Sequence, residues 1–225
     1  MSLRIATLCS ALACLLLGFP APSRAQDPEP EEELPRVELS ALRAAPAENV
    51  GRRVRFVIQV REERASWNPW ITRFGSAQFR SWSAWSDDRM LWERSVWEDP
   101  CETLFARRRQ GAARVLAGAR PYDRFEVVGA VREVFRGIAW IEIESAKRLP
   151  RAVGEGSVLH ASRALELMQQ EAWERALAEL ERARTTLLPR HADARLAELI
   201  AEVEAELEQP EEGAPPGGGV AHSPR

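Results

Sequence analysis

The chain is poor in the residues that build disulfide frameworks and metal centres. It has three cysteines and three histidines among 225 residues. Cys9 and Cys14 fall in an N-terminal segment that we expect to be removed, which leaves Cys101 as the only cysteine of the mature chain. A single cysteine cannot form an internal disulfide or a thiolate metal cluster. We expect Cys101 to be a buried structural residue, and the alternative is a disulfide between two chains.

The few histidines also argue against catalysis. His160, His191 and His222 all lie near the C-terminus, and none has a cysteine or second histidine at metal-ligand spacing. There is no G-x-S-x-G motif and no phosphate-binding P-loop. Asp87-Asp88 falls where a hairpin turn favours aspartate. We therefore predict that the protein is not an enzyme and has no catalytic residue, metal or cofactor.

Lysine is nearly missing, since Lys147 is the only one and arginine carries the remaining positive charge. Such a bias is typical of a GC-rich genome, which we favour as its cause, and also of sites that need guanidinium groups. The net charge of −3 hides an uneven distribution. Residues 36–152 carry +7 and residues 153–225 carry −7. The two parts can attract each other, or the basic part can meet an anionic partner.

The N-terminus has the pattern of a signal peptide. Arg4 precedes an uncharged, mostly apolar run at residues 6–19, and Ser23-Arg24-Ala25 offers a cleavage site. We predict cleavage between Ala25 and Gln26 and export to the periplasm or the extracellular space, with no membrane attachment afterwards. The apolar run is shorter than the ~20 residues of a membrane-spanning helix. An uncleaved anchor is the alternative.

Composition divides the rest of the chain. Residues 26–35 read QDPEPEEELP, an acidic linker with almost nothing apolar to bury. Residues 209–225 are rich in proline and glycine and form a disordered tail by composition. Between them we expect a β-rich domain at 36–152 and a helical segment at 157–208.

Alternating apolar and polar residues predict strands in the β-rich domain. RRVRFVIQV at 52–60 places Val54, Phe56, Ile58 and Val60 on one face. The stretches at 124–135 and 139–149 alternate in the same way. Arg136-Gly137 between them favours a hairpin turn in which glycine adopts a positive φ.

The middle of this domain is less regular. Residues 71–85 are predicted to form a long strand with Gly75 at a bend or bulge. SDDR at 86–89 is typical of a turn, and MLWERSVW at 90–97 is predicted to return as a strand. A short helix is expected within residues 102–120, before Pro121.

The order of strand, hairpin, short helix and hairpin is that of the five-stranded oligonucleotide/oligosaccharide-binding (OB) barrel. NVGRRVRFVIQV, YDRFEVVGAVREVF and AWIEIESAKRL resemble the OB folds of small bacterial modules. The resemblance implies an α+β protein with a small five-stranded OB-like β-barrel before the helical segment. It also implies a ligand-binding face on the second and third strands.

Tryptophan is concentrated where that face is expected. Six of the eight tryptophans lie between residues 67 and 97, more than one layer of a small barrel can bury. Aromatic side chains beside arginines stack bases, sugars or peptide side chains. The ligand-binding candidates are Trp82, Trp85, Arg80, Arg89 and Trp92, with Trp82 and Trp85 the first pair expected at the surface. The alternative is that these tryptophans are structural.

Residues 157–208 have helical periodicity. Trp173, Ala176, Leu180 and Ala183, followed by Pro189, resemble the second helix of one tetratricopeptide (TPR) repeat. The segment departs from that pattern because its first helix lacks the family's glycine and Gln170-Glu171 occupies the turn, where glycine is usual. A third helix follows from residue 191. One repeat cannot bury its own face, so it must pack on the barrel, on a second copy or on a partner.

These observations favour an exported, non-catalytic binding or scaffold protein. The barrel would bind a ligand or a protein partner, and the helical segment would mediate protein contacts and support a homo-oligomer. A single-stranded nucleic-acid-binding OB protein is one alternative, suggested by the +7 charge but opposed by the signal peptide. An enzyme without a recognisable motif is the other.

Overall fold

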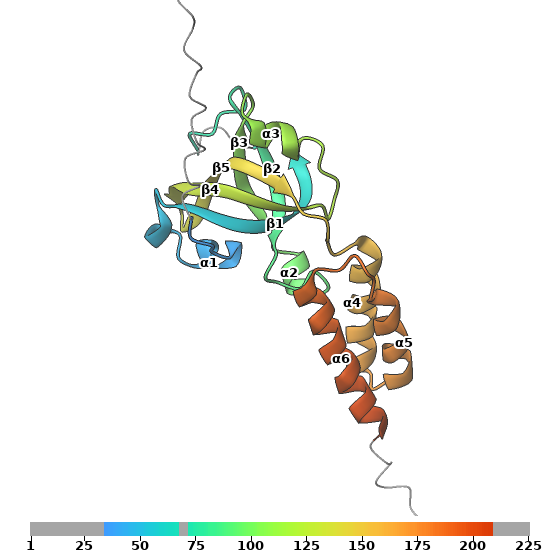
Figure 1. The fold of residues 1–225 in the computed structure, drawn as a ribbon. Helices are drawn as coiled ribbons and strands as arrows, with labels where there is room; N and C mark the ends of the chain where they lie inside the picture. The colour runs from blue at the N-terminus through green and yellow to red at the C-terminus, as the bar shows by residue number, and fades with distance from the viewer. Residues whose placement is uncertain (1–33, 68–71, 209–225) are drawn as a thin grey trace, which may run out of the picture. The chain divides into compact units, whose positions relative to one another are not determined.

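Five strands close into a barrel in the computed structural model, which describes residues 34–67 and 72–208 (Figure 1). The strands are β1 (Arg53–Arg64), β2 (Phe79–Ser86), β3 (Cys101–Arg107), β4 (Arg124–Phe135) and β5 (Ile138–Arg148). Their order around the barrel is β1-β2-β3-β5-β4, and β4 pairs with β1. Only β3 and β5 pair in parallel among the described strands. The predicted α+β class and the closed five-stranded barrel followed by helices are confirmed.

Short helices decorate the barrel and longer ones follow it. The first group is α1 (Leu39–Ala44), the 3-10 turn η1 (Ala47–Asn49), α2 (Arg94–Trp97) and α3 (Gly111–Leu116). The second group is α4 (Glu155–Gln169), α5 (Trp173–Ala183) and α6 (Arg190–Glu208). Within the described ranges, no helix is long and apolar enough to cross a membrane. The predicted signal peptide, its cleavage site at Ala25 and Gln26, and the C-terminal tail lie outside the described residues.

The alternation of β1 fills the barrel interior as predicted. Its four apolar residues at even positions join the main core, together with Trp82 and Ala84 of β2 and Leu104 of β3. The β4–β5 hairpin turns at Arg136 and Gly137, whose φ values are 52° and 77°. Those positive values are the reason that glycine is favoured there. Gly129 is also required, since a Cβ at that position would lie 2.6 Å from the carbonyl oxygen of Glu142.

Two expectations for the middle of the barrel are wrong. Residues 90–97 do not form a strand, because α2 occupies Arg94–Trp97 and turns precede it. The strand that returns is β3, which lies further along the chain. The expected long strand at 71–85 begins only at Phe79, and residues 76–78 form a turn. The short helix expected before Pro121 is present as α3.

A second hydrophobic cluster joins one end of the barrel to the C-terminal helices. Trp85, Leu91, Trp92 and Val96 pack with buried residues of α4, α5 and α6 in this cluster. The backbone N–H of Val153 also donates to the side-chain oxygen of Gln59, a buried residue of β1, at 3.2 Å. The helical segment therefore packs on its own barrel, which was one of the three expected packing partners. We call this cluster the barrel–helix seam.

The residues singled out in the TPR-like stretch are placed inside the seam. Ala176, Leu180 and Ala183 are fully buried, and Trp173 is half-buried and packs against the same cluster. Glu171 lies in the turn between α4 and α5 with a φ of 57°. A non-glycine residue therefore adopts the left-handed conformation at the turn where the TPR pattern has glycine.

Candidate functional site

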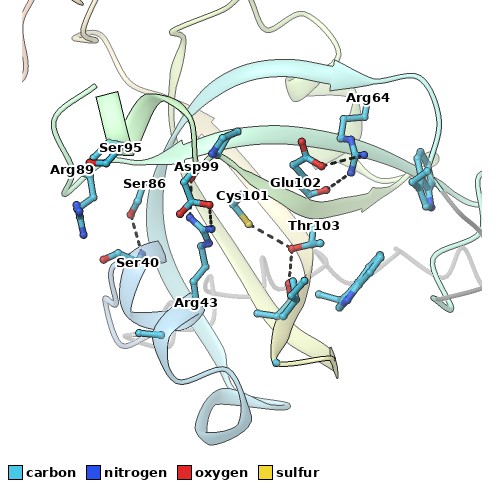
Figure 2. Close-up of a pocket in the computed structure, with 18 residues that line it drawn as sticks. Ser40, Arg43, Arg64, Ser86, Arg89, Ser95, Asp99, Cys101, Glu102 and Thr103 are labelled. Carbon is cyan, nitrogen blue, oxygen red and sulfur yellow. Dashed lines mark hydrogen bonds and ion pairs between the residues drawn. The ribbon is translucent and has the colours of Figure 1, made fainter. Parts of the chain in front are cut away.

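A hollow of about 800 Å³ opens on the barrel beside the first residues of β3 (Figure 2). This volume lies within the range of small-molecule sites, about 300–1,000 Å³. We call it the barrel hollow. Segments far apart in the sequence build it: α1, the region around Arg64 and Trp67, the end of β2, α2, residues 99–103 and the β4–β5 turn. Its lining includes Ser40, Arg43, Arg64, Trp67, Ser86, Arg89, Ser95, Asp99, Glu102, Thr103 and Trp140.

An ion pair between Arg43 and Asp99 forms one side of the hollow. Arg43 donates to the Asp99 carboxylate at 2.7 Å and to its backbone carbonyl at 3.0 Å. Burial is the largest single effect and lowers the pKa of Arg43, but the hydrogen bond to Asp99 and the neighbouring charges together exceed it, so the pKa of Arg43 lies above its ordinary value. This side of the hollow is therefore charged and held in place by two contacts.

A second ion pair spans β2. Arg64 on β1 donates to the backbone carbonyl of Glu102 at 2.8 Å, and its guanidinium lies 3.3 Å from the Glu102 carboxylate. Because β2 pairs with β1 on one side and β3 on the other, this contact crosses the intervening strand.

Ser81 and Ser83 on β2 are buried, and neither hydroxyl has a hydrogen-bond partner among the described residues.

Neutral groups complete the part of the hollow nearest β3. Thr103 donates from Oγ1 to the backbone carbonyl of Ala139 at 2.5 Å, and the sulfur of Cys101 lies 3.6 Å from the same hydroxyl. Cys101 is 3 % exposed, and burial raises the pKa of its thiol. The expectation of a buried Cys101 is confirmed. A neutral, buried thiol is a poor nucleophile, so it acts here as a packing group.

Arg89 is the charge in the hollow that stays available. It is exposed, it lines the hollow, and it forms no ion pair within residues 34–67 and 72–208. Arg43 and Arg64 are each paired with a carboxylate, so Arg89 leaves the lining with one excess positive charge. The Ser40 and Ser86 hydroxyls donate to the Asp88 carboxylate and Thr103 donates to a backbone carbonyl, so an anionic group in the hollow would find the Arg89 guanidinium and the exposed Ser95 hydroxyl.

The other predicted ligand-binding residues are not brought together at this site. Trp82, Trp85 and Trp92 are at most 2 % exposed, so the expectation that Trp82 and Trp85 lie at the surface is wrong. Trp82 fills the barrel interior, and the barrel–helix seam covers Trp85 and Trp92. Arg80 is half-buried and bound to Glu63, with its guanidinium 5.8 Å from the Trp82 ring. Both faces of β2 are covered, which the strand alternation alone could not reveal.

The ring faces of an aromatic cluster on the outside of the barrel are covered by other side chains of the protein. Phe74 stacks on Phe105 at 4.5 Å between ring centroids and 6° between planes, and Phe105 stacks on Trp140 at 5.4 Å. The Trp67 indole donates to the backbone carbonyl of Phe74 at 2.6 Å. The segment before β2 thus places its own phenylalanine on the ring face of β3, where a stacked ligand would otherwise lie.

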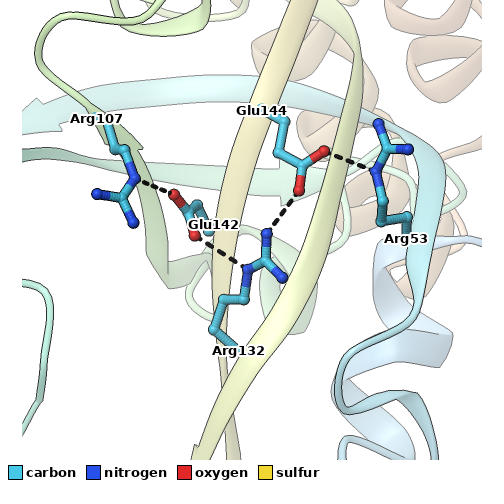
Figure 3. Close-up of polar contacts among 5 residues, drawn as sticks. All are labelled: Arg53, Arg107, Arg132, Glu142 and Glu144. Carbon is cyan, nitrogen blue, oxygen red and sulfur yellow. Dashed lines mark hydrogen bonds and ion pairs between the residues drawn. The ribbon is translucent and has the colours of Figure 1, made fainter.

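Many arginines of the barrel wall are paired with carboxylates. Figure 3 shows a ladder that runs Arg107–Glu142–Arg132–Glu144–Arg53 over four strands. Glu142 is only 5 % exposed and accepts hydrogen bonds from two arginines. Three arginines share two glutamates in this ladder, so it fixes these side chains in place but leaves the net charge of +7 on the domain unchanged. Arg109, Arg114 and Arg120 are exposed and form no ion pair with any described residue, so guanidinium groups remain on the surface of the domain.

Sequence reasoning identified one lining residue of the hollow, Arg89, and missed most of the others. Arg43, Asp99 and Thr103 carry no local motif, and they meet only because α1, β3 and the β4–β5 hairpin converge. No histidine is among the described residues that line the hollow. A scan against protein-family models found no match for the chain, and a search among curated proteins found none either.

Proposed function

We propose that this is an exported, non-catalytic binding protein whose barrel hollow takes an anionic group of a ligand or protein partner. The hollow with its unpaired Arg89 is the observation that carries this proposal. The Arg89 guanidinium and the Ser95 hydroxyl are the lining groups suited to recognition, and the one thiol of the hollow is buried, which raises its pKa. Export rests on the signal-like segment at residues 1–25.

We further propose that the helical segment is a single TPR-like hairpin with a third, capping helix. The burial of Ala176, Leu180 and Ala183 supports it, as does the turn conformation at Glu171. Leu187, just before α6, and Leu207, in its last turn, remain exposed at 63 % and 40 %, and each provides an apolar position for a protein contact at one end of this helix. A second copy of the chain is one such partner.

The nucleic-acid alternative has less support. Phe74 covers the aromatic face that would stack bases, and the ladder in Figure 3 holds three arginines of the barrel wall against two glutamates. Single-strand binding that weakens steeply with salt would still favour that alternative. An enzyme would require turnover that is lost when hollow residues are changed.

Site-specific photo-crosslinking tests the proposed binding function. A benzophenone amino acid replaces Ser95, an exposed residue of the hollow, and a control replaces the exposed Ala77 outside it. In the intact host we expect a defined adduct from position 95, its loss in the Arg89→Glu variant, and no such adduct from position 77. Equal adducts from both positions would contradict the proposal. The mature N-terminus, read by mass spectrometry, is expected to be Gln26 if export is correct.

Truncation is a poor test of the helical segment. Removing residues 157–208 would uncover Trp85, Leu91 and Trp92, which the helices bury. Point substitutions keep the seam intact, so Leu187→Glu and Leu207→Glu are preferred. We expect each substitution to weaken binding of the protein partner that contacts the helical segment, or to weaken self-association measured by analytical ultracentrifugation. Neither substitution should lower the unfolding midpoint. If both variants behave as wild type, the proposed protein contact lies elsewhere.

A further inference from the structure

A separate groove of about 640 Å³ lies between α2 and α4. α4 contributes residues spaced three or four apart from Glu155 to Gln169, so one face of this helix forms a wall. α2 contributes Arg94 and Trp97, and Tyr122 comes from the chain just before β4. Neither the barrel hollow nor Arg89 takes part in this groove.

One end of the groove is an ordered aromatic stack. Trp97 stacks on the buried Trp85 at 4.7 Å between centroids and lies 6.0 Å from the Tyr122 ring with 27° between planes. The Trp85 indole donates to the Trp97 carbonyl at 3.2 Å, and the Tyr122 N–H donates to the Val60 carbonyl at 2.7 Å. Tyr122 is held at a φ of 72°, which a bulky residue adopts only under constraint from its surroundings. The rings are therefore fixed before any ligand arrives.

The same end of the groove carries a carboxylate, Glu155, in the first turn of α4. Burial raises the pKa of the Tyr122 phenol, and the negative charge of the nearby Glu155 carboxylate raises it further. Glu155 is exposed and forms no ion pair with any residue that the structure describes. At the other end, Arg94 pairs with Glu98 at 2.8 Å. A positive charge is thus favoured beside Glu155, Trp97 and Tyr122.

Apolar side chains extend from this charged end along the groove. Trp92, Val158, Leu159 and Leu165 line it, and Leu159 is 45 % exposed. Aromatic faces with a nearby carboxylate attract ammonium and guanidinium groups, and an apolar floor accepts the rest of such a molecule. The volume matches a small molecule rather than a folded partner.

We propose that this groove binds a small organic cation, with its positive group beside Trp97, Tyr122 and Glu155 and its apolar body toward Leu159 and Leu165. The site is independent of the barrel hollow. It needs no metal and no chemical step. Attraction of the cation by the ring faces and by the carboxylate supplies selectivity over neutral and anionic compounds of the same size.

Calorimetric titration of the mature chain with benzyltrimethylammonium tests the site, with 3-phenylpropionate as an anion of similar shape. Glu155→Gln is compared with Glu174→Gln, because both glutamates are exposed and lie in the first turn of a helix. We expect about five-fold weaker binding for Glu155→Gln, wild-type binding for Glu174→Gln, and binding of the anion about ten-fold or more weaker than that of the cation. Tyr122→Leu is expected to weaken binding as well.

Three results would overturn the proposal. The first is equal affinity in the two glutamine variants, and the second is equal affinity for the cation and the anion. The third comes from acetyl-Leu-Arg-amide, which carries a guanidinium as part of a peptide. If this peptide binds more than about ten-fold tighter than benzyltrimethylammonium, the groove takes the side chain of a partner protein rather than a free small cation.

Discussion

Arg124 and Asp87 form a two-point ion pair where the end of β2 meets the start of β4. Nε and one terminal nitrogen of Arg124 each lie 2.6 Å from an oxygen of Asp87. The side chains are 14 % and 5 % exposed, so the pair is shielded from water on both sides. His191, at the start of α6, lies 4.0 Å from the same carboxylate. The Asp87 carboxylate thus joins the end of β2 to the start of β4 and lies beside the first turn of α6.

Removing one partner of this pair should be costly. Asp87→Asn leaves the Arg124 guanidinium buried without its counter-charge, and we expect a loss of about 3 kcal/mol in the free energy of unfolding. The exposed pair Arg184–Asp193 is the control, since Asp193→Asn should cost about 1 kcal/mol or less. Urea unfolding followed by tryptophan fluorescence measures both. Equal midpoints for the two variants would show that the Asp87 pair does not stabilise the fold.

The tryptophans of β2 should be protected from solvent. The double variant Trp82→Phe/Trp85→Phe is expected to raise the acrylamide-accessible fraction of the fluorescence, because it removes two buried indoles from the total emission and none from the accessible part. Trp97→Phe should reduce that fraction, since Trp97 is half-buried and lines the groove. Trp82→Ala should cost about 3–5 kcal/mol as a cavity in the barrel. Loss of the accessible fraction in the β2 double variant would restore the surface interpretation.

Glycine at the α4–α5 turn should stabilise the protein. Glu171 has a φ of 57°, and a left-handed conformation costs a non-glycine residue about 1 kcal/mol. Glu171→Gly is therefore expected to raise the free energy of unfolding by up to about that amount. The neighbouring Gln170 has a φ of −95°, so Gln170→Gly should give no gain and a small loss. Thermal melts of the two variants compare them directly.

The stability that the contact between α4 and α5 contributes should decrease at acidic pH. His160 Nδ1 lies 2.7 Å from the Glu179 carboxylate, and this hydrogen bond, with the Arg182 charge, lowers the pKa of Glu179. A carboxyl whose pKa is lowered by folding adds stability above the range in which a free glutamate titrates, and that stability is lost as the pH falls through the folded pKa. His160→Gln should flatten this acid limb of the stability curve. Urea midpoints between about pH 3 and 6 measure the effect. An unchanged limb would mean that the contact does not couple to folding.

The sequence predicted those parts of the fold that are written in local patterns. The period-two alternation of β1 and β4 and the turn at Arg136-Gly137 needed no knowledge of distant residues. The strand prediction for residues 90–97 was wrong because it relied on the preference of tryptophan and valine for strands. Packing in the barrel–helix seam determines the conformation of these residues instead. The barrel hollow could not be predicted from the sequence for a related reason. Arg43 and Asp99 are distant in sequence and meet only once the barrel closes.

The barrel–helix seam can form only late in synthesis, after the C-terminal helices have been made. Trp85, Leu91 and Trp92 are made well before the C-terminal helices whose apolar residues belong to the same hydrophobic cluster. At about 5–20 residues per second, the end of the barrel stays uncovered for some seconds after its strands have been synthesised. During that interval the nascent chain exposes an apolar surface that no local structure can hide. A chaperone that holds the nascent chain has its clearest target there.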